Sequence, residues 1–203
     1  MSALLRAIIF DLDGTLVNSR LDFTAMRAEL GAPESLGLLE YVETLSSESA
    51  RHEAMAVIHR HELAGAEAAE WMPTAEEALH ALHQQGTPIA IVTRNSRHAA
   101  QITMQRLDMP DIPLKAREDA APKPDPEALL MVAAEWNIDP KHCAYIGDFH
   151  YDIQAAQRAG MMPVLYTQGG EPRENYDIQL QVLSDFRALL ALLHEQSDSS
   201  STP

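Results

Sequence analysis

The stretch FDLDGTLVNS, Phe10 to Ser19, follows directly on the apolar residues Ala7–Phe10 and places two aspartates one residue apart. A short apolar run of this kind predicts a buried strand. Side chains alternate along a strand, so Asp11 and Asp13 are expected to point to the same side. Two carboxylates held together repel each other unless a cation lies near them. The stretch therefore predicts a charged site at the end of the first strand.

Other runs along the chain also have the composition of buried strands. The first strand is expected over Leu4–Phe10, and further strands over Pro88–Thr93, Cys143–Gly147, Met162–Thr167 and, more weakly, Ile112–Ala116. Helical sequence separates these runs, and strand–helix–strand alternation is typical of a parallel sheet with helices on both faces. We therefore expect an α/β fold with a doubly wound, Rossmann-like parallel sheet.

Several helices have recognisable ends in the sequence. Thr74-Ala-Glu-Glu77 has the pattern of a capping box and predicts the start of a helix that stops at Gly86. Near the end of the chain, apolar residues at helical spacing predict a last helix with Phe186, Leu189, Leu190 and Leu193 on one face.

One long segment interrupts the alternation of strands and helices. From about Ser19 to Met72 the sequence is helical and contains no good strand, which predicts a helical insertion after the first strand. The last residues are polar and of low complexity. The expected organisation is an α/β core formed by residues 1–17 and 73–197, a helical insertion over 18–72, and a disordered tail over 198–203.

Composition narrows the classes of function. The formal charge of -15 argues against a nucleic-acid-binding surface, which needs a basic face. No apolar run approaches the roughly 20 residues that cross a bilayer. Cys143 is the only cysteine, so no internal disulfide can form, and a reducing cytoplasm is the expected location. We expect a protein with no nucleic-acid or membrane partner, as a monomer or homodimer.

Polar residues follow several of the predicted strands. Thr93 closes the second strand, Lys123 follows the weak third one, and Asp148 and Asp152 follow the fourth. Active sites of doubly wound sheets lie beyond the carboxyl ends of the strands, so these residues are expected to meet the first aspartate pair. Four clustered carboxylates need a cation, and oxygen ligands favour a hard ion such as Mg²⁺.

These motifs, in this order, resemble those of the haloacid dehalogenase-like (HAD) hydrolase superfamily, in its phosphatase branch. They are Asp11-x-Asp13-Gly14-Thr15, then Thr93, then Lys123, then Gly147-Asp148-x-x-x-Asp152. The resemblance covers about Leu4–Val17 and Thr74–Leu193. A lone DxD is weak evidence, but the whole set is specific.

The resemblance implies a role for the first two aspartates. Asp11 would be the nucleophile that forms an aspartyl-phosphate, and Asp13 would be the general acid and then the general base. Dehalogenase members carry an aromatic residue in place of Asp13, so the acid here favours phosphate chemistry. The resemblance also implies Mg²⁺ as cofactor, with Asp11, Asp13 (through its backbone carbonyl), Asp148 and Asp152 as its ligands.

The resemblance further implies that Thr93, Asn95 and Lys123 bind phosphate, and Arg94, which stands beside Thr93, is added to this set for its charge. Thr93 and the main-chain N–H of Asn95 would bind the phosphoryl oxygens, while Arg94 would add positive charge. Lys123 would offset the charge of the nucleophile and the phosphate. Asp152 would reach the metal through water or hold this lysine.

The insertion over 18–72 stands where relatives carry a small helical C1-type cap, which closes over the site and selects substrate. Arg20, Arg27 and Arg51 are the candidates within it for touching substrate. Phe149 and His150 follow Asp148 where small residues are more usual, so this loop is expected to narrow the entrance.

The expected activity is Mg²⁺-dependent hydrolysis of a small soluble phosphate monoester, either phosphoglycolate-like or a sugar phosphate. A phosphomutase with the same nucleophile is an alternative, although a short cap argues mildly against it. A non-catalytic binding or regulatory protein with this fold is a further alternative, but such proteins usually lose the nucleophile or the metal-binding acid.

Overall fold

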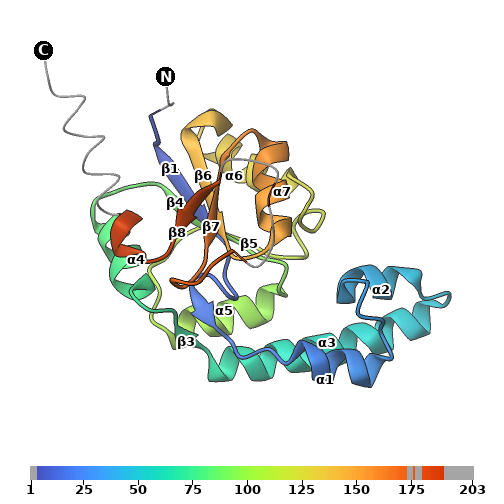
Figure 1. The fold of residues 1–203 in the computed structure, drawn as a ribbon. Helices are drawn as coiled ribbons and strands as arrows, with labels where there is room; N and C mark the ends of the chain where they lie inside the picture. Colours follow the sequence, from blue (N-terminus) through green and yellow to red (C-terminus); the bar gives the residue numbers. More distant parts are fainter. Residues whose placement is uncertain (1–3, 173–175, 177–179, 190–203) are drawn as a thin grey trace, which may run out of the picture.

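A six-stranded parallel sheet forms the centre of the protein in the computed structural model, which describes residues 4–172, 176 and 180–189 (Figure 1). The strands of this sheet are β1 (Ala7–Phe10), β4 (Ile89–Val92), β5 (Leu114–Lys115), β6 (Cys143–Gly147), β7 (Met162–Tyr166) and β8 (Gln181–Leu183). The helices around it are α4 (Ala75–Gln84), α5 (Arg97–Arg106), α6 (Glu127–Glu135) and α7 (His150–Ala159), with a 3-10 turn at Pro140–His142. The predicted Rossmann-like α/β fold is confirmed.

The order of the strands, β5-β4-β1-β6-β7-β8, places β1 between β4 and β6. The chain builds outward on one side through β4 and β5, and then returns to β6 on the other side of β1. Such a reversal leaves a crevice at the carboxyl ends of the strands, where α/β proteins bind ligands. The residues that directly follow β1, β4 and β6 therefore lie around one point.

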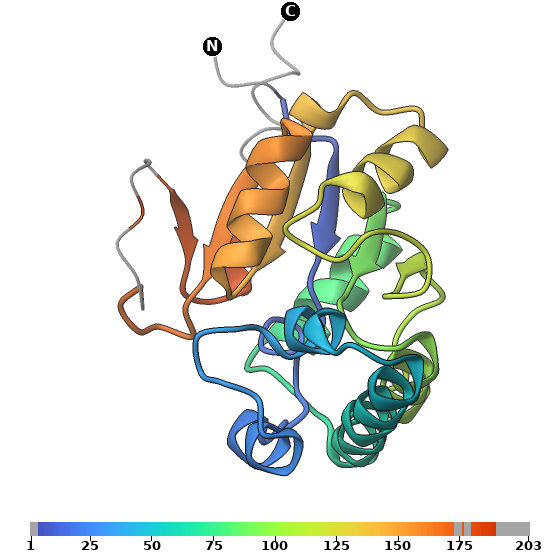
Figure 2. The same ribbon diagram turned by 90° about the vertical axis from the view of Figure 1, so that its right-hand side faces the viewer.

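Alternating residues of β1 support two layers of core. Ile8 and Phe10 pack with α4 and α5 on one face of the sheet. Ala7 and Ile9 pack on the other face with α6 and α7, which Figure 2 shows together on the near side of the sheet. No helix in the described part of the chain is long and apolar enough to cross a membrane.

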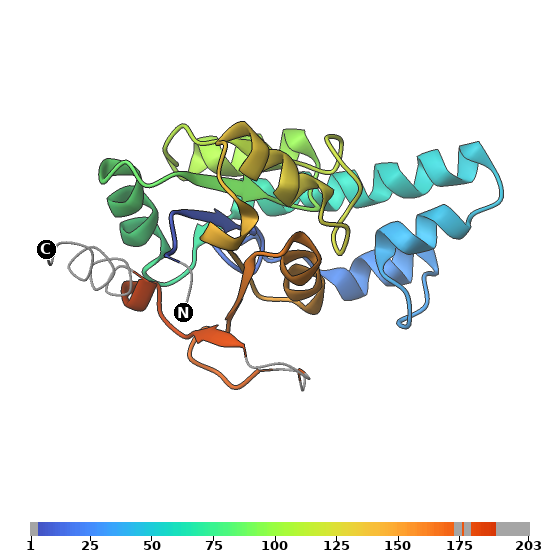
Figure 3. The ribbon, with the colours of Figure 1, turned by 90° about the horizontal axis from the view of Figure 1, so that it is seen from above.

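Three helices fill the segment between β1 and α4. They are α1 (Phe23–Leu30), α2 (Leu38–Thr44) and α3 (Glu48–Ala68), and they project away from the sheet (Figures 1 and 3). They share a small core of their own, made by Met26, Ala32, Leu38, Val42, Ala54 and Ile58. We call these three helices and their connections the helical insertion.

The expectation of no strand within the insertion was wrong at its end. Residues Glu70–Trp71 form β3, which pairs antiparallel with β2 (Val17–Asn18) at the base of the insertion. Each strand has only two residues, too few for alternation to show in the sequence. Pairing the two ends fixes where the chain leaves the α/β core and where it returns.

Other boundaries also differ from the sequence-based expectations. β1 begins at Ala7 rather than Leu4, and β8 was not predicted, because its three residues carry no distinct pattern. Phe186 and Leu189 are buried as expected of the last helix. Leu190, Leu193 and the expected tail lie outside the described residues.

The predicted capping box at Thr74 was also wrong. Thr74 has a φ of +64° and makes no side-chain cap bond to α4. Its hydroxyl instead lies 2.9 Å from Asp185 Oδ1 and accepts a hydrogen bond from the Phe186 N–H. Partners that are distant in the sequence have therefore replaced the expected hydrogen bond to the first turn of α4. They hold Thr74 in a left-handed conformation, which is unfavourable for a β-branched residue.

Substitution of Thr74 should separate these two effects. Thr74→Ala and Thr74→Gly both remove the hydroxyl, but only glycine also removes the cost of a positive φ. We expect both variants to lower the free energy of unfolding, with the glycine variant about 1 kcal/mol more stable than the alanine variant. Urea titration measures the difference, and equal losses would contradict the left-handed conformation.

Candidate active site

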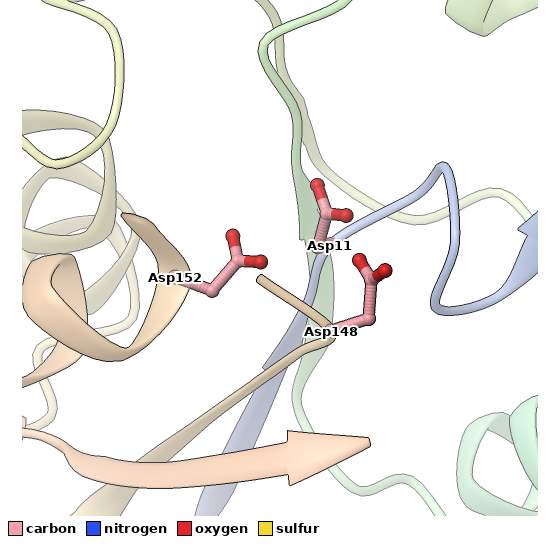
Figure 4. A group of neighbouring side chains, drawn as sticks. All are labelled: Asp11, Asp148 and Asp152. Atoms are coloured by element: carbon pink, nitrogen blue, oxygen red, sulfur yellow. The ribbon is translucent and has the colours of Figure 1, made fainter. Parts of the chain in front are cut away.

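Three carboxylates meet at the carboxyl end of the sheet, as Figure 4 shows. Asp11 follows β1, Asp148 follows β6, and Asp152 lies in the first turn of α7; oxygen atoms of the three lie within 4.8 Å of one another. Asp11 and Asp152 are buried, whereas Asp148 is partly exposed. More than 130 positions of sequence separate Asp11 from Asp148 and Asp152, and the strand order brings them together.

A tight turn after β1 lets the chain pass close to this cluster. The Gly14 N–H donates to the Val17 carbonyl at 2.8 Å, and Gly14 has a φ of +88°. A Cβ atom at Gly14 would lie 2.6 Å from the nearest carboxylate oxygen of Asp148. Glycine is therefore required here both for the backbone conformation and for the space that Asp148 occupies.

Lys123 holds the buried half of the cluster together. Its Nζ donates to Asp11 Oδ1 at 2.6 Å and to Asp152 Oδ1 at 2.7 Å. Lys123 is only 5% exposed, so both ion pairs are shielded from water. Asp152 Oδ2 also accepts from the Phe149 N–H, which fixes Asp152 at the start of α7. The geometry favours Asp152 as the residue that holds the lysine.

Tyr145 is a site residue that the sequence analysis missed. It is fully buried in β6, and its hydroxyl accepts from Lys123 Nζ at 2.7 Å. The same hydroxyl lies 3.0 Å from the Val92 carbonyl and 3.1 Å from Asp152 Oδ1. Its only signal in the sequence is a hydroxyl-bearing residue inside a strand that is otherwise apolar.

Asp13 lies in different surroundings from Asp11. Its Oδ2 accepts from Asn95 Nδ2 at 3.0 Å, whereas its Oδ1 is buried with no hydrogen-bond partner among the described residues. Thr93 and Asn95, both buried, follow β4, and Thr93 Oγ1 accepts from the Asn95 N–H. The carboxylate of Asp13 does not belong to the three-carboxylate cluster. It lies instead beside Asn95, one of the predicted phosphate-binding residues.

Burial raises the pKa of both aspartates that follow β1. For Asp11, Lys123 opposes this rise, while the charges of Asp152 and Asp148 add to it. For Asp13, hydrogen bonds from Ser19 and Asn95 oppose the effect of burial. Burial lowers the pKa of Lys123, but Asp11 and Asp152 more than compensate, so the lysine stays protonated.

The donor set fits a divalent metal ion. Three carboxylates face one ammonium group, which leaves an excess of negative charge in a largely buried site. All the donors are oxygen atoms, which favours a hard cation such as Mg²⁺ over a transition metal. Asp11 and Asp148 would hold such an ion, with Asp152 beside it.

The arginines predicted to meet substrate have other partners. Arg94 Nη2 lies 2.5 Å from Glu40 Oε1 in α2, and its guanidinium stacks 4.6 Å from the centre of the Tyr151 ring. Arg27 donates to two carbonyls of the loop before α2. Arg20 pairs with Glu70 and Arg51 donates to the Leu45 carbonyl, and neither lines the cavity described below.

A largely buried ion pair between Glu62 and Arg117 joins the insertion to the core, and no pattern in the sequence predicts it. The two guanidinium nitrogens of Arg117 lie 2.6 Å and 3.1 Å from the carboxylate oxygens of Glu62 in α3. Arg117 also donates to the Arg94 carbonyl. This bidentate pair fixes α3 above the loop that carries Thr93.

A cavity of about 620 Å³ lies between the insertion and the carboxyl ends of the strands. The core side of its wall includes Asp11, Asp13, Thr93, Asn95, Lys123 and Asp148, and the insertion contributes α1, α3 and the loop before α2. All the motif residues predicted to be catalytic, phosphate-binding or metal-binding therefore line the same cavity.

Taken together, the doubly wound sheet, the carboxylate cluster at its switch point and the cavity above it define an α/β enzyme with an acidic site. The family model for haloacid dehalogenase-like hydrolases matches residues 5–160. The chain belongs to this family.

Curated relatives include named phosphatases. The chain is 30% identical to a phosphoglycolate phosphatase of Xanthomonas campestris over 78% of this chain and 81% of the relative. It is 27% identical to validoxylamine A 7'-phosphate phosphatase of Streptomyces hygroscopicus over 90% of this chain and 96% of the relative.

The fold is similar to that of solved structures. A haloacid dehalogenase-like hydrolase from Bacteroides fragilis superposes with a TM-score of 0.76, covering 91% of this chain and 99% of the other, at 22% identity. At this level of identity the likeness supports the fold.

Proposed function

We propose that this protein hydrolyses phosphate monoesters of small molecules with the help of Mg²⁺, through a phosphorylated Asp11. That the protein is a phosphatase of the haloacid dehalogenase-like family rests on the family match and on the phosphatases among its relatives. The metal, the covalent intermediate and the residue roles are the proposal.

The observation that carries the proposal is the unequal environment of two aspartates that face one cavity. Burial raises the pKa of both carboxyls, but at Asp11 the bonded ammonium group of Lys123 opposes this rise, and a bound cation would oppose it further, which favours an ionised nucleophile. Asp13 keeps one buried oxygen without a hydrogen-bond partner among the described residues, and burial raises its pKa, which favours a proton on this carboxyl. One aspartate is thus suited to attack and the other to donate a proton.

In the first step a carboxylate oxygen of Asp11 attacks phosphorus. The bond from phosphorus to the alcohol oxygen breaks, its electron pair stays on that oxygen, and Asp13 supplies the proton that makes the alcohol. Thr93 and Asn95 line the same cavity as Asp13. We expect the Thr93 hydroxyl and the Asn95 main-chain N–H, which here donates to Thr93 Oγ1, to donate to the phosphoryl oxygens. Lys123 offsets the negative charge that collects around the nucleophile.

In the second step Asp13, now ionised, takes a proton from water, and the water oxygen bonds to phosphorus. The bond between phosphorus and Asp11 breaks and its electron pair returns to the carboxylate. One ester and one water give one alcohol and one inorganic phosphate. Bound Mg²⁺, held by Asp11 and Asp148, would reduce the repulsion between the phosphate and the carboxylates.

Phosphate release from acetyl phosphate and a panel of phosphate monoesters tests this proposal. We expect release with Mg²⁺, loss of release in EDTA, and recovery when Mg²⁺ is restored. Unchanged release in EDTA would contradict the metal requirement. No release from any ester would contradict the proposed activity.

A pair of glycine variants tests the metal site separately. Gly14 and Gly31 both have a positive φ, but only at Gly14 would an added Cβ meet Asp148; at Gly31 it would meet nothing within 4 Å. Alanine at either position should cost roughly 1–2 kcal/mol of stability. Only Gly14→Ala should also raise the Mg²⁺ concentration for half-maximal activity, by about tenfold or more. Equal metal dependence in both variants would contradict Asp148 as a ligand.

A further inference from the structure

We infer that the alcohol released by this enzyme is an uncharged molecule with a ring, and that Phe23 and Phe149 bind that ring. The inference rests on the proposed function and names the class of its substrate. It decides between the two classes expected from the sequence, against a short acid such as phosphoglycolate.

Half of the exposed large hydrophobic side chains in the described part of the chain line the cavity. Among the described residues, the exposed large hydrophobic side chains are Leu4, Phe23, Leu36, Leu130, Phe149 and Val182. Phe23, Leu36 and Phe149 all line the cavity. Phe23 is 55% exposed at the start of α1, and Phe149 is 43% exposed next to Asp148. Exposed apolar groups that gather at one opening mark a binding surface rather than chance exposure.

The core side of this surface is held in place by its neighbours. The Phe149 ring centre lies 4.1 Å from that of His150 and 5.3 Å from that of Tyr151. Arg94 stacks on Tyr151 from the cavity wall. A rigid aromatic surface of this kind binds the flat face of a sugar or aromatic ring at little cost in side-chain entropy.

The positively charged groups of the cavity wall already have partners. Among the described lining residues, Lys123 contacts Asp11 and Asp152, Arg94 contacts Glu40, Arg117 contacts Glu62, and Arg27 donates to carbonyl groups. Glu62 is buried and Arg117 is only partly exposed, so pulling Arg117 toward a ligand would leave the Glu62 carboxylate buried without its main partner.

A carboxylate on the leaving group would therefore find an unfavourable environment. The wall also carries Glu34, besides the aspartates of the site. A carboxylate that enters such a space loses its water. Among the described lining cations only Arg27 lacks a carboxylate partner, and its guanidinium already donates to two carbonyls, so the loss of water is poorly compensated. An uncharged leaving group avoids this cost.

The size of the cavity agrees with a ring. At about 620 Å³ it falls in the range of roughly 300–1,000 Å³ that is typical of sites for drug-sized ligands. A two-carbon acid beside the phosphate would leave most of the apolar wall exposed to water. A ring would cover Phe23 and Phe149 and remove that apolar area from solvent.

Steady-state kinetics of the full chain test the inference. The probes are glucose 6-phosphate and a nucleoside monophosphate as ring esters, phosphoglycolate and 3-phosphoglycerate as acids, and acetyl phosphate as a ligand without a ring. We expect kcat/KM for the better ring ester to exceed that for both acids by about tenfold or more. Acetyl phosphate turnover reports the hydrolytic chemistry whatever the leaving group.

Variants then locate the ring. Phe149→Ala and Phe23→Ala should each raise KM for the ring ester about tenfold, and by much less for acetyl phosphate. Val182→Ala, an exposed apolar residue on β8 that does not line the cavity, is the matched control and should change neither value. The result supports the inference only if the wild-type enzyme prefers the ring ester and if both phenylalanine variants raise KM for that ester.

Three results would overturn the inference. If acetyl phosphate is hydrolysed but phosphoglycolate is the better ester, or if the phenylalanine variants leave KM for the ring ester unchanged, the leaving-group class is wrong and the phosphatase stands. If acetyl phosphate and every ester are inert with Mg²⁺, the proposed function fails and the inference fails with it.

Discussion

Asp11→Asn is expected to lower kcat by about 10³-fold or more, because it removes the nucleophile while keeping the shape of the side chain. The fold should survive the change. The asparagine oxygen can still accept from Lys123 Nζ, and Asp152 remains to pair with the lysine. Phosphate release and urea unfolding of the same sample measure the two effects.

Asp111→Asn is the matched control for this variant. Asp111 is exposed and lies far along the chain from the cluster, in the loop between α5 and β5. It should leave both kcat and stability unchanged. If Asp11→Asn kept much more phosphatase activity than the expected loss in kcat allows, the nucleophile would have to be another group.

Lys123→Met should produce the largest loss of stability that we expect of any single change. The variant leaves Asp11 and Asp152 facing each other in a buried site without the cation that bonds to both. Removing one partner of a buried ion pair costs about 3–5 kcal/mol, because the remaining charge is neither paired nor solvated. Urea titration in EDTA measures this cost without any help from a bound metal ion.

The matched control is Lys141→Met, which removes an ion pair of the same length at the surface. Lys141 Nζ lies 2.7 Å from Asp139 Oδ2, but the two side chains are 61% and 51% exposed. Water and salt screen such a pair, so its loss should change stability little. Similar losses in the two lysine variants would contradict the buried electrostatic role of Lys123.

The central sheet was predictable because its strands are fully buried. Ile8, Ile9 and Phe10 have almost no exposed surface, and neither do Ile91 and Ile146 in the adjacent strands. Continuous apolar runs therefore mark them in the sequence. The two-residue strands β2 and β3 depend on pairing between segments that are distant in the sequence, and no local pattern predicts them.

The meeting of the motif residues followed from the topology. Residues after parallel strands collect at one edge of the sheet, so Asp11, Thr93 and Asp148 could be expected together from their order alone. The contacts of Thr74 were not predictable, since its local pattern is that of a cap and Asp185 lies more than 100 residues away.

The partners of several residues in and near the cavity could not be predicted from the sequence, because these partners come from distant parts of the chain. Arginines such as Arg27 and Arg94 looked available, but the fold pairs them with carbonyls or with Glu40. Tyr145 and the Glu62–Arg117 pair were missed for the same reason. The sequence shows which side chains are charged or can form hydrogen bonds, but it does not show which of them already have partners in the fold.

The most direct test of the account is to trap the enzyme during turnover and find where the phosphate is. The enzyme is mixed with excess acetyl phosphate and Mg²⁺, quenched in acid within the first turnovers, digested, and examined by mass spectrometry. The account predicts a phosphoryl group on the peptide that contains Asp11, removed by hydroxylamine as expected of an acyl phosphate. Turnover with no phosphorylated peptide, or with the phosphate on another residue, would contradict it.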